Sequence, residues 1–225
     1  MDIIIKEKNT RLCFSADFVK KDELIEWINI VGPHICMLKT HIDILEDFDN
    51  NVITELIRLK KKYNFLICED RKFGDIGKTF HKQLYGGIYK IGSWADIITI
   101  HGISSAGMLQ SLDSLGIIKP KILIVSQMSS QNNIIDSNYT HQCYSIALKY
   151  PKLVIGFISQ YKFIDDDNFL FITPGIRNDK VLSLDQNYRT PNIALNEQKN
   201  DVIIVGSGIY EYPKKNLNEI ILNYK

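Results

Sequence analysis

The chain has 225 residues, 45% of them apolar and 24% charged, which suits one large globular domain or two small ones and excludes a disordered chain. Its 27 Lys and Arg residues nearly balance 26 Asp and Glu residues, and the formal charge of +1 excludes the basic field of a nucleic-acid-binding protein. The longest apolar stretch, residues 153–158, is far shorter than the roughly 20 residues of a membrane-spanning helix, so we expect no membrane partner.

Short runs rich in Ile, Val, Leu and Phe recur along the chain. They are apolar at nearly every position instead of alternating, which is typical of strands buried on both faces of a parallel sheet. We expect strands at residues 11–17, 34–41, 65–70, 96–101, 121–128, 153–160, 170–173 and 202–206.

Stretches with helical periodicity lie between these runs. Apolar residues spaced three and four apart predict helices around residues 24–31, 52–57 and 217–221. A further helix is expected at residues 75–93, with an interruption near Gly86 and Gly87. The link at residues 161–169 has room only for a short turn of helix.

Alternation of strands with helices predicts parallel strands joined by right-handed crossovers. Eight such units in a chain of this length favour an α/β fold of the (β/α)8, or TIM-barrel, type, with residues 1–225 forming one domain. The alternative is an open doubly wound sheet. That fold would carry a glycine-rich turn after its first strand, and residues 13–20 contain no glycine.

The four cysteines are too few for a disulfide framework, and no two of them have C-x-x-C spacing. This usage indicates a reducing, cytoplasmic location. His141 and Cys143 resemble half of a metal site, but the sequence offers no second pair of ligands, so no metal is predicted.

Polar residues follow the expected strands at the end where a barrel carries its chemistry. Two lysines and two aspartates are expected to meet there, and they are Asp17, Lys39, Asp70 and Lys72. Each also has a purely structural interpretation, as a helix cap, a surface lysine or an ion pair between residues on one strand face. His41 and His101 are equally open, since hydrogen-bonded histidines at a barrel rim are common.

Residues 68–79 (CEDRKFGDIGKT) resemble the signature of the orotidine 5′-monophosphate decarboxylases, in their eukaryotic form. Further blocks agree in order and spacing, and the resemblance covers about residues 11–210. These blocks are residues 38–45, 94–96, 101–102, 128–130, 173–175, 186–190 and 201–206.

The resemblance implies decarboxylation of orotidine 5′-monophosphate to uridine 5′-monophosphate, the last step of de novo pyrimidine synthesis, without metal or organic cofactor. The catalytic charges would be Lys39, Asp70, Lys72 and Asp75. Lys72 would protonate C6 of the pyrimidine and stabilise the carbanion that forms there. Asp70 would lie beside the substrate carboxylate.

The resemblance also implies a set of substrate-binding residues and a homodimer. Asp75 and Thr79 would reach the site of the neighbouring subunit, Asp17 and Thr79 would bind the ribose, and Ser129 the pyrimidine edge. The full binding set is Asp17, Lys39, His41, Thr79, Ser129, Pro174, Gln186, Tyr188, Gly206 and Ser207.

One position departs from the family pattern. The family uses an arginine between two glycines to grip the substrate phosphate, and here Ser207 occupies that place. A serine hydroxyl cannot replace the charge of a guanidinium. Arg177, Lys180 or Arg189 could compensate, and the alternative is an impaired or non-catalytic nucleotide-binding homologue.

Two further expectations concern relatives. A superfamily member acting on a sugar phosphate with Mg²⁺ shares part of the signature, but Arg71 and the block at residues 186–188 argue against it. Because the barrel uses every expected strand, no room is left for a phosphoribosyltransferase domain, and we expect a monofunctional chain.

Overall fold

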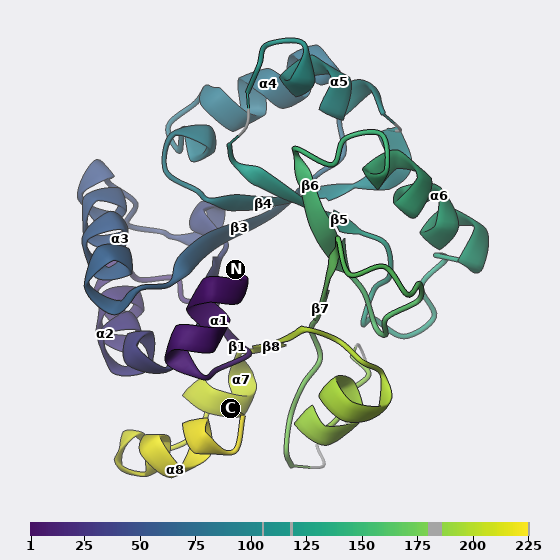
Figure 1. The fold of residues 1–225 in the computed structure, drawn as a ribbon. Helices are drawn as coiled ribbons and strands as arrows, with labels where there is room; N and C mark the ends of the chain where they lie inside the picture. Colours follow the sequence, from purple (N-terminus) through teal and green to yellow (C-terminus); the bar gives the residue numbers. More distant parts are fainter. Residues whose placement is uncertain (105, 118, 180–185, 225) are drawn as a thin grey trace.

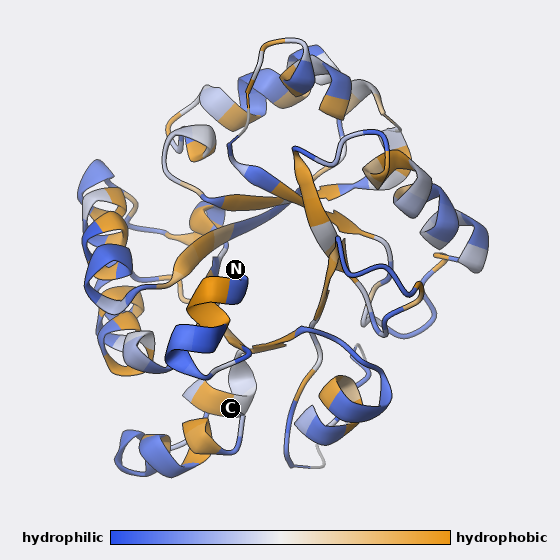
Figure 2. Cartoon of the chain, viewed as in Figure 1, coloured by the Kyte–Doolittle hydropathy of each residue, from blue (hydrophilic) through white to orange (hydrophobic). Residues whose placement is uncertain are grey.

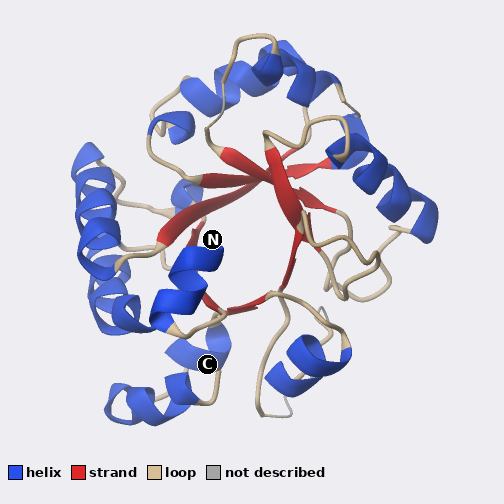
Figure 3. Ribbon diagram, viewed as in Figure 1, coloured by secondary structure: helices blue, strands red, loops and turns tan. Residues whose placement is uncertain are grey.

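The computed structural model describes residues 1–104, 106–117, 119–179 and 186–224. Its strands form a closed barrel of parallel strands in the order β1 to β8, with β8 pairing back onto β1 (Figures 1 and 3). The strands are β1 Leu12–Ala16, β2 Met37–Thr40, β3 Leu66–Phe73, β4 Ile97–His101, β5 Lys121–Val125, β6 Val154–Ile158, β7 Leu170–Thr173 and β8 Val202–Val205.

Helices surround this barrel, as the ring of blue ribbons in Figure 3 shows. Their bounds are α1 Asp2–Lys8, α2 Lys21–Val31, α3 Asn50–Tyr63, α4 Gly77–Tyr85, α5 Gly107–Asp113, α6 Ser137–Ala147, α7 Ser207–Tyr210 and α8 Leu217–Leu222. The α2 stripe at Leu24, Trp27, Ile28 and Val31 is buried, as its spacing predicts. The predicted (β/α)8 barrel is confirmed.

Two apolar cores stabilise the barrel. The larger lies between the strands and the helices, and the smaller fills the barrel interior around Cys13, Met37 and Leu123. Figure 2 shows the strands as mostly hydrophobic, and the outer helices as hydrophobic on one side only. Apolar burial on both strand faces explains why the strand sequences do not alternate.

Some predicted boundaries are wrong. The helix expected at residues 75–93 begins only at Gly77 and ends at Tyr85, and a short 3-10 turn follows at Ile91–Ser93. The predicted break near Gly86 is therefore real. No helix forms in residues 161–169, where bends and turns make the whole link between β6 and β7.

Helix α1 was not predicted from the sequence, and it lies across one end of the barrel (Figure 1). Its residues Met1, Ile4 and Ile5 pack against the interior core, so the apolar start of the chain closes the end of the barrel opposite the polar strand ends. In the described part of the chain, no helix is long and apolar enough to cross a membrane.

Candidate active site

A cavity of about 500 Å³ opens at the carboxyl ends of the strands. Eleven of the residues predicted from the sequence line it, which confirms that the strand ends converge. They are Asp17, Lys39, His41, Asp70, Lys72, Ser129, Pro174, Gln186, Tyr188, Gly206 and Ser207.

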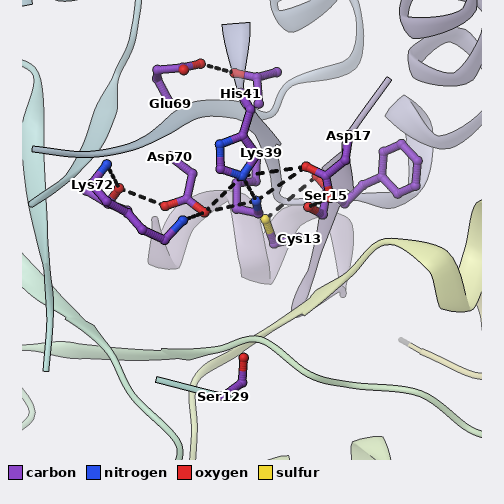
Figure 4. A network of polar contacts seen from close by, with 12 residues as sticks. Cys13, Ser15, Asp17, Lys39, His41, Glu69, Asp70, Lys72 and Ser129 are labelled. Atoms are coloured by element: carbon purple, nitrogen blue, oxygen red, sulfur yellow. Dashed lines mark hydrogen bonds and ion pairs between the residues drawn. The ribbon is translucent and has the colours of Figure 1, made fainter. Parts of the chain in front are cut away.

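The charged residues of the cavity form one connected network (Figure 4). Asp70 Oδ2 lies 2.7 Å from Lys72 Nζ and 3.0 Å from Lys39 Nζ, so one carboxylate oxygen joins two ammonium groups. Lys39 Nζ is also 3.6 Å from Asp17 Oδ1. The network therefore alternates in sign from Asp17 through Lys39 and Asp70 to Lys72.

Burial and charge together set the ionisation of this network. Burial raises the pKa of Asp70, but the attraction of Lys39 and Lys72 outweighs it and holds the pKa of that carboxyl well below its usual range. Burial lowers the pKa of Lys39, while Asp70 and Asp17 raise it to above its ordinary value. Asp70 and Lys39 are both charged at neutral pH.

His41 completes the network as a neutral group. Burial and then the charge of Lys39 lower the pKa of His41. Its Nε2 lies 2.9 Å from Lys39 Nζ, so the neutral ring can accept a hydrogen bond from the ammonium. His41 therefore orients Lys39 without adding charge.

The end of β3 is irregular where it presents Asp70 and Lys72. The register with β4 shifts between Glu69 and Phe73, and Lys72 has a φ of 50°, in the left-handed region. Thr99 on β4 stabilises this bend, since its Oγ1 accepts from Lys72 N at 2.9 Å and donates to Asp70 Oδ1 at 2.8 Å. The two charges thus meet through a bulge, and simple two-residue alternation does not describe their arrangement.

Glu69 is completely buried behind the network. Its carboxyl oxygens accept hydrogen bonds from Thr40 Oγ1 at 2.7 Å and from Ile42 N at 2.9 Å. Burial raises the pKa of Glu69 to about 8. These contacts link the end of β3 to the residues on either side of His41 and so hold the two lysine-bearing strand ends in register.

The opposite wall is formed by the segments after β5 and β7 (Figure 4 labels Ser129). Gln186 Nε2 donates to Ser129 Oγ at 3.3 Å, and Asn187 N donates to Ser129 O at 2.9 Å. Gly175 has a φ of 77°, and a Cβ there would come within 2.8 Å of Asn187 O. A Cβ there would also come within 3.3 Å of Ser129 Cβ, so only glycine lets the segment after β7 fold back on itself this closely beside Ser129.

Two of the three cations considered as replacements for the missing arginine lie in the described residues. Arg177 does not itself line the cavity, but its Nη1 donates at 3.0 Å to the Oγ of Ser207, which does. Arg189 instead donates to Thr173 Oγ1, Pro174 O, Gln160 O and Gln198 Oε1, and it does not line the cavity. Lys180 lies outside the described residues.

Comparison with known proteins identifies the family. A model of the "Orotidine 5'-phosphate decarboxylase / HUMPS family" matches residues 10–218. The chain belongs to this family. It is 42% identical over 216 residues to the orotidine 5′-phosphate decarboxylase of Rhizopus oryzae, covering 94% of this chain and 82% of that relative.

A second sequence relative and a solved structure are also similar to this chain. The uridine 5′-monophosphate synthase of Bos taurus is 39% identical over 208 residues, which are 92% of this chain and 43% of the synthase. A solved orotidine 5′-phosphate decarboxylase from Pyrococcus horikoshii has a TM-score of 0.70 at 18% identity, covering 95% of this chain and 98% of the other. The latter supports the barrel fold alone.

Two residues that the family resemblance implicates do not line the cavity of their own chain. Asp75 and Thr79 are both partly buried, and the Asp75 carboxylate accepts from Ile76 N at 2.7 Å. Asp75 therefore does not belong to the ion-pair network within one subunit. Its contribution across a dimer interface stays a prediction, because the structure holds one chain.

Sequence reasoning missed several residues of the site. Ser15 donates to Asp17 Oδ2 at 2.7 Å, and both Tyr210 and Glu211 line the cavity beside Ser207. The signal for Ser15 was present, as a hydroxyl at the end of an apolar strand. Thr99 lies in the middle of β4, where its position gave no such signal. Nothing in the sequence pairs Glu211 with Arg177, which lies more than thirty positions earlier.

Proposed function

We propose that this chain decarboxylates orotidine 5′-monophosphate to uridine 5′-monophosphate. The observation that carries the proposal is the array in which Asp70 joins Lys39 and Lys72 at the mouth of the barrel, in a member of this family. Two ammonium groups supply the positive charge that the reaction needs, so the proposal includes no metal and no organic cofactor.

The chemical step follows from the position of these charges. The bond between C6 and the substrate carboxylate breaks, carbon dioxide leaves, and the electron pair stays on C6. Lys72 then donates a proton to C6 and regains one from solvent. A fixed ammonium stabilises the developing carbanion before the proton moves, because it needs no reorganisation during the reaction.

Asp70 has two roles in this proposal. It holds Lys39 and Lys72 in place through ion pairs at 3.0 and 2.7 Å. It also places a negative charge where the substrate carboxylate must lie, and this repulsion ends when carbon dioxide leaves. The first role is the one on which the proposal relies, because ammonium groups already held in place stabilise the charge that develops at C6.

The other cavity residues would bind the substrate. Asp17 binds ribose hydroxyls, and Ser129, held by Gln186, binds the pyrimidine edge. Gln186, Tyr188, Gly206 and Ser207 receive the phosphate, while Pro174 and His41 shape the remaining walls. Phosphate binding far from C6 contributes to catalysis when its free energy holds the reacting groups together.

We further propose a cytoplasmic homodimer in which Asp75 and Thr79 complete the partner's site. Mixing Lys72→Ala and Asp75→Asn subunits tests this. A hybrid dimer keeps one intact site, so random exchange should restore about a quarter of the wild-type activity. If the two inactive variants stay inactive after exchange, Asp75 acts within its own subunit.

The decisive test of function is the loss of orotidylate absorbance in the presence of a chelator. Decarboxylation that survives chelation supports the proposal and excludes a Mg²⁺-dependent sugar-phosphate enzyme. A second candidate is a nucleotide-binding protein without catalysis, which Ser207 favours because the phosphate loses its arginine. Tight binding of uridine 5′-monophosphate without turnover would establish that candidate instead.

A further inference from the structure

Arg177 is held between two carboxylates at the phosphate end of the cavity. Asp179 pairs with it on the side away from Ser207, through Nε to Oδ1 at 2.6 Å and Nη2 to Oδ2 at 3.0 Å. Glu211 accepts from Nη1 at 2.7 Å, the same nitrogen that donates to Ser207 Oγ. One guanidinium thus faces two carboxylates, and the cluster carries a net negative charge.

The two carboxylates differ in position. Glu211 and Ser207 line the cavity, whereas Asp179 does not. The Arg177 side chain is only 7% exposed and is fixed by its bidentate pair with Asp179, but the Glu211 side chain is 53% exposed. Glu211 can therefore leave Arg177 at low cost, because exposed ion pairs contribute little free energy.

The Glu211 carboxylate marks the place where an anionic oxygen binds Arg177 from the cavity side. A phosphate oxygen could occupy the same place, with Ser207 Oγ beside it. Both anions cannot bind there at once, because like charges in contact repel and Nη1 has only two hydrogens to donate.

We propose that Glu211 is a specificity-determining residue that competes with the substrate phosphate for Arg177. The inference rests on the proposed function, since it deepens the account of the phosphate subsite. In the free protein Glu211 occupies the donor, and the 5′-phosphate of a nucleotide must displace it. Glu211 thereby lowers the affinity for phosphorylated ligands and leaves the affinity for the nucleoside unchanged.

Glu211→Gln tests this, with Glu219→Gln as the matched control on the exposed surface of α8. Calorimetry with uridine 5′-monophosphate and with uridine separates the phosphate contribution, and kinetics give KM and kcat. We expect Glu211→Gln to tighten nucleotide binding and lower KM about two- to fivefold. Uridine binding, kcat and every value for Glu219→Gln should stay as in the wild type.

The proposal is tested by whether Glu211→Gln binds uridine 5′-monophosphate more tightly or more weakly than the wild type does. Weaker nucleotide binding in Glu211→Gln would mean that Glu211 holds Arg177 in place for the phosphate, and would overturn the proposal. Equal tightening for uridine, or no change for the nucleotide, would overturn it too. Failure of the proposed function looks different: the wild type would not decarboxylate, while the binding measurements would still report on Glu211.

Discussion

Replacing Ser207 with arginine restores the cation that the family places at the end of β8. Ser207 is the first residue of α7 and lines the cavity, so the new guanidinium reaches the phosphate from the cavity wall. A hydrogen bond to a charged group contributes about 1.5–3 kcal/mol. We therefore expect tighter substrate binding in Ser207→Arg.

Three costs reduce this gain. The variant loses the bond in which Ser207 Oγ accepts from Arg177, worth about 1 kcal/mol. Glu211 can pair with the new arginine, which costs up to about 1 kcal/mol at an exposed site. Ordering the long side chain costs up to about 1 kcal/mol more. With the upper end of the gain, about 3 kcal/mol, and half of each upper limit for the last two costs, about 1 kcal/mol remains, which corresponds to a roughly fivefold lower KM.

Steady-state decarboxylation of orotidine 5′-monophosphate measures this change, with Ser207→Gln as a control of similar polarity and no charge. KM should fall in the arginine variant and not in the glutamine variant. An unchanged KM would refute the reasoning, because it would mean that Arg177 already binds the phosphate at full strength in the wild type, without competition from Glu211.

Further predictions concern the charge network and its support. Lys72→Ala should lower kcat at least about a thousandfold while the protein stays folded, and substantial residual turnover would exclude Lys72 as the proton donor. Burial raises the pKa of Glu69 to about 8, so the native state keeps a proton on this carboxyl that the unfolded chain releases near pH 4.5. The contribution of this proton to the free energy of unfolding is fully present below about pH 4.5 and is lost as the pH rises to about 8. In the wild type, chemical denaturation should show the free energy of unfolding fall by an amount on the order of 3–5 kcal/mol between these pH values, and in Glu69→Gln this fall should be absent. Equal pH dependence of the unfolding free energy in both proteins would contradict a buried neutral carboxyl. Gly175→Ala should lose about 1–3 kcal/mol of unfolding free energy and raise KM, because the residue keeps a φ of 77° against Asn187; a variant with wild-type stability and KM would show that the loop can move away.

The sequence predicts the site well wherever position along a strand decides it. Parallel strands bring their carboxyl ends to one mouth, so Lys39 on β2 and Asp70 on β3 must meet once the strands are recognised. The same reasoning places Ser129, Pro174 and Gly206 on the rim. That residues 1–225 act as one domain stays a prediction.

Prediction fails where backbone irregularity or distant contacts decide the geometry. Two-residue alternation correctly pairs Asp70 with Lys72, but for the wrong reason, because Lys72 lies in a bulge at positive φ. The support from Thr99 depends on the register of β4 against that bulge. Glu69 looks from the sequence like one more charge at a strand end, and only its burial shows that it faces away from the cavity.

The missing arginine is the point at which structure adds most to the sequence. β7 and β8 are neighbours in the barrel, with Thr173 paired to Ile203, so residues that follow the two strands converge on one place. A cation lost from the end of β8 can therefore be replaced by one from the end of β7, thirty residues earlier. Arg177 follows β7 and lies close enough to replace that cation, because it donates a hydrogen bond to Ser207 itself. Arg189 instead donates hydrogen bonds to Thr173, Pro174 and two glutamines. A cation is thus kept beside Ser207, with Glu211 as its partner. If the substrate phosphate binds there as proposed, its affinity depends on displacing the Glu211 carboxylate from Arg177.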